Sequence, residues 1–151
     1  GEREGRPGGT RFGTLVHAVL AECPLSADAR AVAAMARHQG RLLDAPDEEV
    51  VAATEAAEAA LAHPILVAAR AAEARGACRR ECPITVPLDD GTSAEGVVDL
   101  AYRDGERWVV VDFKTDREIG DKPVHAAQLA IYARAVRAAT GREVETVLLY
   151  V

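Results

Sequence analysis

The sequence has no surplus of basic residues, no long apolar run and no closely spaced pair of cysteines. Asp and Glu (24) outnumber Lys and Arg (18), so the net charge is −6 at pH 7. This balance argues against tight autonomous binding to a phosphate backbone, because such binding needs clustered Lys and Arg. It leaves open a nucleic acid that another component delivers. A local cluster of acidic residues is also what a Mg²⁺ site needs.

Membrane segments and targeting signals are missing as well. No apolar run approaches the roughly 18–20 residues that a membrane helix needs, and there is no signal peptide. We therefore expect no membrane partner. The cysteines Cys23, Cys78 and Cys82 are odd in number, which leaves at least one thiol unpaired and fits a reducing cytoplasm. The spacing of Cys78 and Cys82 is not that of a C-x₂-C metal hook, so we expect free, partly buried thiols.

The composition suits one domain with a hydrophobic core, because 49% of the 151 residues are hydrophobic and 28% are charged. The opening GEREGRPGG is typical of a flexible linker. Since the chain starts with Gly1 rather than Met, we expect a domain from a longer protein. We place a linker at 1–11 and a single domain at 12–151, with helices over 12–76 and a sheet with one helix over 80–151.

Apolar residues recur with helical spacing through the first half of the chain, as Phe12, Val16 and Leu20 illustrate. Gly40 is expected to close the second helix, and Gly76 is the candidate C-cap of the last one. The expected helices span about 12–22, 27–39 and 47–62, with further helical turns up to 75.

The pattern changes to strands near residue 80, where runs rich in β-branched and aromatic residues alternate with turn clusters. Three strands, a helix and a last strand follow the first helices, which indicates an α/β domain with a mixed sheet. The expected strands span 81–88, 94–102, 107–114 and 145–151, and the expected helix spans about 122–140.

Charged residues lie inside the second and third expected strands rather than at the turn between them. An Asp-Gly turn at 104–105 is a strong hairpin signal, and it would set Val97 opposite Asp112. Because side chains alternate along a strand, Asp99, Asp112 and Lys114 would then share one face, and the other face would be apolar.

Two carboxylates held together in an apolar sheet are costly unless something compensates their charge. A divalent metal does so, and carboxylate oxygens suit Mg²⁺ or Mn²⁺. Lys114 can hold or polarise an attacking water. The alternative is a hairpin in which Asp112 pairs with Lys114 and Asp99 is solvated. The apolar residues before Asp99 and Asp112 favour the metal site.

Four motifs, in this order along the chain, resemble the RecB-like branch of the PD-(D/E)xK nucleases over roughly residues 12–151. They are G-x-x-x-H ending at His17, G-x-x-D-L at 96–100, D-F-K-T at 112–115 and Q-x-x-x-Y at 128–132. The resemblance implies a restriction-endonuclease-like αβββαβ core behind an N-terminal helical portion. It also implies Mg²⁺-dependent hydrolysis of phosphodiester bonds in DNA, with Mn²⁺ as a substitute metal.

The same resemblance implies roles for individual residues. Asp99, Asp112 and the backbone carbonyl of Phe113 would bind the metal, which His17 would reach from the N-terminal helix. Lys114 would be the catalytic lysine. The remaining implied roles are that Gln128 and Tyr132 orient the lysine or the DNA backbone, and that Glu81 is an outer-shell group.

Within that branch, the chain looks most like the C-terminal nuclease domain of AddA- or RecB-type helicase–nucleases, which resect DNA ends. This implies an exonuclease module that receives a single strand from helicase domains of the same chain, and possibly a second subunit. No cysteine follows Cys82, so we expect no iron–sulfur cluster, and no Walker motif is present, so ATP would act only through a helicase portion. The alternatives are a stand-alone restriction or phage-type nuclease, or a non-catalytic module that threads DNA or docks protein.

Overall fold

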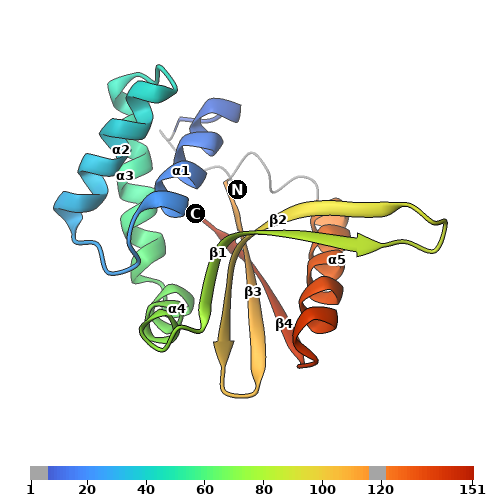
Figure 1. The fold of residues 1–151 in the computed structure, drawn as a ribbon. Helices are drawn as coiled ribbons and strands as arrows, with labels where there is room; N and C mark the ends of the chain where they lie inside the picture. Colours follow the sequence, from blue (N-terminus) through green and yellow to red (C-terminus); the bar gives the residue numbers. More distant parts are fainter. Residues whose placement is uncertain (1–6, 116–121) are drawn as a thin grey trace. The chain divides into compact units, whose positions relative to one another are not determined.

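The computed structural model describes residues 7–115 and 122–151, so most of the expected linker, residues 1–6, lies outside the described part. The elements in chain order are α1 (Thr10–Glu22), α2 (Ala29–Leu42), α3 (Asp47–Ala62), α4 (Pro64–Ala74), β1 (Cys78–Pro87), β2 (Ser93–Asp104), β3 (Arg107–Lys114), α5 (Lys122–Thr140) and β4 (Val144–Tyr150) (Figure 1). No described helix by itself is long and apolar enough to cross a membrane; α3 and α4 pass that test only when they are joined across their break.

The chain divides into two compact units. The first comprises the described residues within 1–67, 113–120 and 150–151, and the second those within 68–112 and 121–149. Strand β3 therefore contributes its last two residues to the first unit and the rest to the second.

In the first unit, α1, α2 and α3 pack against one another. Helix α3 begins with three acidic residues, which favour a helix N-terminus because of the helix dipole. One of them, Glu49, accepts two hydrogen bonds from the Arg11 guanidinium, at 2.9 and 3.0 Å. This bidentate ion pair joins the start of α1 to the start of α3.

The boundaries of α2 differ from the expected ones at both ends. The Asp28 side chain accepts a hydrogen bond from the Ala31 N–H at 2.8 Å, so Asp28 is the N-cap and the helix begins at the residue after it. Gly40 does not close the helix but lies inside it. A Cβ at Gly40 would come within 2.6 Å of Val50 Cγ2, so this glycine permits the close approach of α2 and α3.

Gly76 is the helix stop that the sequence predicts. It has a positive φ of 72°, and the N–H of Ala77 bonds the carbonyl of Ala72 while the N–H of Gly76 bonds that of Glu73. This pair of bonds is the Schellman motif that ends many helices. The chain then enters β1 at once, three residues before the expected start of the strand, because Cys78 and its neighbours pair with the end of β2.

The sheet has the order β1-β2-β3-β4. β1 pairs with β2 and β2 with β3 in antiparallel fashion. The Trp108 N–H bonds the Glu143 carbonyl early in β3 and β4, and the Val151 N–H bonds the Lys114 carbonyl at their ends, as parallel strands require. The sheet is therefore mixed, which confirms the expected α/β class and the αβββαβ order.

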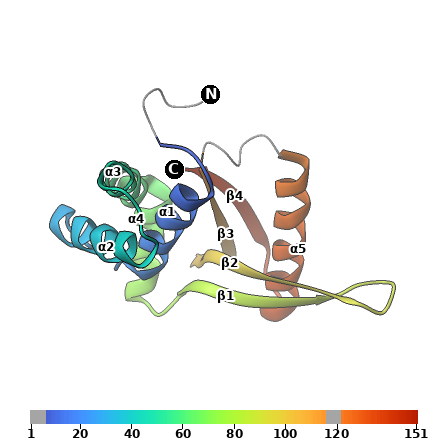
Figure 2. The ribbon, with the colours of Figure 1, turned by 90° about the horizontal axis from the view of Figure 1, so that it is seen from above.

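β1 is an edge strand of this sheet. Two of its residues are prolines, Pro83 and Pro87, and both are exposed. Both views show β1 and β2 as a long two-stranded ribbon (Figures 1 and 2).

Helix α5 covers one face of the sheet in the second unit (Figure 2). Its Leu129 and Tyr132 form a buried cluster with Val98, Ala101 and Val110. Trp108 packs against this cluster, which supports a packing role over stacking on a base. The other partly buried members are Cys82, Ile84, Ile131, Val136, Val144 and Leu148.

The turn of the β2–β3 hairpin lies one residue later than expected. Asp104 pairs with Arg107, so Gly105 and Glu106 form the turn. Gly105 is the first central residue and has a φ of 63°, as in type II′ turns, which follow the twist of the strands. The register consequently shifts by two residues, and the expected pairing of Val97 with Asp112 is wrong.

The three cysteines are free thiols, as expected: Cys23 is buried, and Cys78 and Cys82 are partly buried. Burial, with a smaller contribution from the Glu73 carboxylate, raises the pKa of the Cys78 thiol to about 11.

This pKa predicts slow alkylation of Cys78. At pH 8 the folded thiol holds about one hundredth of the thiolate of a thiol with a pKa of 9.0. The greater nucleophilicity of a more basic thiolate offsets about half of this on a logarithmic scale. We expect iodoacetamide to modify Cys78 about tenfold more slowly in the folded chain than in urea. Peptide mass spectrometry over time measures this, and equal rates would contradict the raised pKa.

Candidate active site

Three acidic residues lie at one level of the sheet, on three neighbouring strands of the second unit. In the β1–β2 ladder, the pairs Arg80–Leu100 and Cys82–Val98 bracket Glu81 and Asp99. In the β2–β3 ladder, the last pair is Leu100–Val111, and one step further on are Asp99 and Asp112. The observed register therefore sets Asp99 opposite Asp112, closer than the diagonal arrangement that the expected turn implied.

The strands are irregular at this level. Val98 and Ala101 are three positions apart, yet both belong to the cluster that packs with α5. Residues three apart in a regular strand point to opposite faces, so β2 changes its facing at Asp99 and Leu100. Glu81, across from Asp99 on β1, has a positive φ of 46°, which is uncommon for a residue other than glycine. The expectation that Val98 faces away from Val110 is therefore wrong.

The D-F-K-T motif is buried, with Asp112, Phe113, Lys114 and Thr115 only 2–8% exposed. Charged side chains are seldom buried unless they are paired or bind a metal. The Oδ2 atom of Asp112 is buried and accepts no hydrogen bond among the described residues, although the side chain does have an interaction partner. Asp99 is partly buried and Glu81 is exposed.

His17 of α1 contacts the D-F-K-T motif within the first unit. Its ring lies edge-on to the ring of Phe113, with the ring centroids 6.3 Å apart and an interplanar angle of 64°. His17 is partly buried. The first motif of the sequence thus adjoins the residue between Asp112 and Lys114.

The Q-x-x-x-Y motif lies on the side of α5 that turns toward the sheet. Tyr132 is buried and Gln128 is partly buried. His125, three residues before Gln128, is also buried, which argues for a role in packing rather than at the surface. Thr115 is a further buried polar residue that received no role from the sequence, although it closes the D-F-K-T motif.

The glycine of the G-x-x-D-L motif lies against the tyrosine of the Q-x-x-x-Y motif. A Cβ on Gly96 would come within 2.8 Å of Tyr132 Cε1 and 3.1 Å of its hydroxyl oxygen. Both residues belong to the second unit, three positions before Asp99 and on α5 respectively. The contact explains why the motif has a glycine here: the ring of Tyr132 occupies the space of a side chain.

We expect Gly96→Ala to lower the free energy of unfolding. Replacing glycine by alanine in a strand ordinarily stabilises a protein by roughly 0.4–1 kcal/mol. Overpacking against a buried ring costs about 1–3 kcal/mol, so the clash outweighs that gain. Urea denaturation of Gly96→Ala, Tyr132→Leu and the double variant measures the coupling.

The double variant should be more stable than the two single losses predict by addition, because the leucine vacates part of the space. Gly8→Ala is the matched control, since a Cβ there would meet nothing within 4 Å. Strictly additive losses would contradict a direct Gly96–Tyr132 contact.

The oxygen donors of the second unit and of Phe113 fit a hard divalent cation. The described residues contain no group of three or more His, Cys, Asp or Glu side chains that could hold a metal ion. Two carboxylates and one backbone carbonyl do not need such a group, because Mg²⁺ usually keeps several water ligands and takes oxygens from its substrate. Carboxylate and carbonyl oxygens suit Mg²⁺ or Mn²⁺ better than softer metals.

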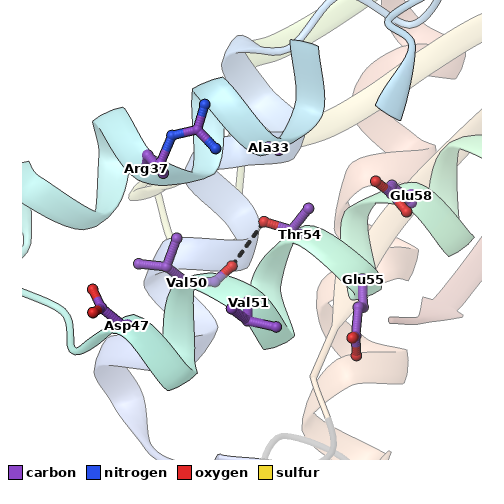
Figure 3. Close-up of a pocket in the computed structure, with 8 residues that line it drawn as sticks. All are labelled: Ala33, Arg37, Asp47, Val50, Val51, Thr54, Glu55 and Glu58. Carbon is purple, nitrogen blue, oxygen red and sulfur yellow. Dashed lines mark hydrogen bonds between the residues drawn. The ribbon is translucent and has the colours of Figure 1, made fainter. Parts of the chain in front are cut away.

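A hollow of about 530 Å³ lies between α2 and α3 in the first unit, and it contains none of the motif residues. Thr54 turns its hydroxyl to the Val50 carbonyl at 2.8 Å (Figure 3), which leaves a mainly apolar floor. The carboxylates of Asp47, Glu55 and Glu58 line the hollow. Their negative charge disfavours a phosphate ligand, so the hollow is not the candidate active site.

Comparison with known proteins agrees with the motifs. The family described as the PD-(D/E)XK nuclease superfamily matches residues 2–151. One of the two kinds of subunit of an ATP-dependent helicase/nuclease, from Carboxydothermus hydrogenoformans, is 42% identical over 60 residues, which are 36% of this chain. The match spans only 5% of that relative's length.

Proposed function

We propose that this chain, which belongs to the PD-(D/E)XK nuclease superfamily, is a divalent-metal-dependent nuclease domain that hydrolyses phosphodiester bonds in DNA. The observation that carries the proposal is the register that sets Asp99 opposite Asp112, two positions before the buried Lys114. A salt-bridged hairpin would need neither a second carboxylate at this level nor the burial of the whole motif.

Asp99, Asp112 and the Phe113 carbonyl would hold Mg²⁺ or Mn²⁺. The bound cation would supply Lewis-acid activation of water and neutralise charge on the phosphate. Asp99 and Asp112 also exclude other anions from this level of the sheet, because their charges repel them. Lys114 donates hydrogen bonds to the attacking water or to a phosphate oxygen and offsets the charge that develops there. The products would carry a 5′-phosphate and a 3′-hydroxyl.

The other motif residues assist. Gln128 and Tyr132 share one face of α5 and would orient the lysine or the DNA backbone. Tyr132 also lies on Gly96, so its ring supports the strand that bears Asp99. The proposed roles of His17 as a further metal ligand and of Glu81 as an outer-shell group rest on the motifs, with the Phe113 contact as support for His17.

We further propose that the domain is the exonuclease module of a helicase–nuclease that acts in DNA end resection and recombinational repair in the cytoplasm. The support is the similarity to the helicase/nuclease relative from Carboxydothermus hydrogenoformans and the acidic net charge, which suits a domain that receives its strand from a motor. ATP would then act through helicase domains of the same chain, and a second subunit could complete the assembly.

The test is cleavage of end-labelled single- and double-stranded DNA in Mg²⁺, Mn²⁺ or EDTA. Cutting that requires the metal supports the nuclease and reveals its polarity. If the folded chain binds Mn²⁺ but cuts neither substrate, even when joined to the helicase portion of its full-length gene product, the proposal is wrong.

A further inference from the structure

Three arginines gather in the second unit where α4 ends and β1 begins. We call Arg75, Arg79 and Arg103 the arginine corner. Arg79 pairs with Ala101, and the Arg103 N–H bonds the Ala77 carbonyl at 2.9 Å, so Arg79 and Arg103 are diagonal neighbours on one face of the β1–β2 ribbon. The Arg75 guanidinium lies 3.3 Å from the Arg103 carbonyl oxygen.

The corner carries positive charge that no described carboxylate pairs with. All three arginines are exposed, and none forms an ion pair with a described residue. The neighbouring arginines differ: Arg107 pairs with Glu145 at 3.1 Å and Arg142 with Glu106 at 2.6 Å. In a chain of net charge −6, three adjacent cations of this kind concentrate positive potential at one place.

Backbone carbonyls hold two of these side chains in position. Arg75 donates to the carbonyl of Ala71 at 3.1 Å and Arg79 to that of Gly76 at 3.2 Å. These bonds alone would suit a helix C-terminus, where cations stabilise the last turn. They engage only part of the five N–H donors of each guanidinium. They do not account for Arg103, whose side chain has no such bond in the described part of the chain.

We infer that the arginine corner binds the phosphodiester backbone of a nucleic-acid strand. Guanidinium groups match phosphate geometry and bind it bidentately. Arg103 follows Asp99 by four residues on β2, which is about 13 Å along a strand. A DNA strand stacked at about 3.4 Å per nucleotide would cover this span with roughly four nucleotides. The corner would thus grip the substrate a few nucleotides away from the proposed catalytic carboxylates, so this inference rests on the proposed function.

The first test measures DNA binding without cleavage. The chain with Asp112→Asn is titrated in EDTA against a fluorescent single strand of about 20 nucleotides, at several salt concentrations. Adding Arg79→Gln and Arg103→Gln should weaken binding about tenfold or more at low salt. It should also reduce the slope of log affinity against log salt by about 1.4, since each phosphate contact on a single strand contributes about 0.7.

The matched control is the double variant Arg30→Gln, Arg41→Gln. Both residues are exposed on α2 and form no ion pair with a described residue, so the net charge changes equally. The control should leave the slope unchanged. If the corner variant keeps the wild-type slope, or if the control loses as much, the corner does not bind the strand.

The second test separates this inference from the proposed function. With Asp112 restored and Mg²⁺ present, the corner variant should cut the long strand at least fivefold more slowly at subsaturating DNA. Strands too short to span roughly four nucleotides should be cut equally by variant and wild type. Cutting that is unimpaired on long strands would overturn the corner and leave the nuclease intact. A reduced salt slope without any cutting would support the corner and count against the nuclease.

Discussion

Replacing Asp112 with asparagine is expected to abolish DNA cleavage while the chain stays folded. The carboxylate is buried at the level of Asp99, and a metal held there would provide several kcal/mol of transition-state stabilisation. At about 1.36 kcal/mol per factor of ten, the loss is roughly 10³-fold or more. Cleavage rates in Mg²⁺ and titration with Mn²⁺ measure the effect, and both activity and metal affinity should fall.

Asparagine has nearly the shape of aspartate, so the far-ultraviolet circular dichroism spectrum should stay that of the wild type. Asp104→Asn is the matched control: it lies on the same hairpin, but its side chain is 59% exposed. That variant should cut at the wild-type rate. A folded Asp112→Asn chain that retains cleavage would remove Asp112 from the site.

Replacing Lys114 with methionine should also stop cleavage, but it should spare metal binding. The methionine keeps most of the length of the buried side chain, which is 8% exposed, and removes its charge and donors. Positioned groups of this kind contribute about 10²–10⁴-fold to a rate, so we expect a loss in that range. Mn²⁺ affinity should stay the same or rise, since a neighbouring positive charge is gone.

The two variants therefore separate binding from chemistry. A loss of both activities in Asp112→Asn, beside a loss of cleavage alone in Lys114→Met, assigns the metal to the carboxylate and the chemistry to the lysine. Should Lys114→Met lose its Mn²⁺ affinity although its spectrum is unchanged, the lysine would instead organise the metal site.

Elements with strong local signals were predictable from the sequence. The bounds of α3 and β3 agree with the expected ones, and Gly76 ends α4 as its position predicts. Where a tertiary contact decides, the local signal failed. Gly40 looks like a helix stop, but it serves the packing of Val50. The polar start of β1 shows no strand signal, and pairing with β2 makes it a strand.

The candidate site was predictable in composition and less so in geometry. Residue spacing brought Asp99, Asp112 and Lys114 together, and a shift of two residues preserves which side chains share a face. The sequence could not show that β2 changes its facing at Asp99, because that depends on how Val98 and Ala101 both reach α5. Nor could it show that Gly96 accommodates Tyr132, since the two residues are far apart in the chain.

The prolines of β1 bear on how the chain avoids self-association. An edge strand offers unpaired N–H groups on which another chain can add a strand, a common start of aggregation. Pro83 and Pro87 have no N–H, and proline in a sheet is found where the missing donor would face away from the partner strand. The free side of β1 therefore lacks two donors in succession along the ribbon. A domain that waits for a DNA strand with its sheet edge exposed is thereby protected from joining copies of itself edge to edge.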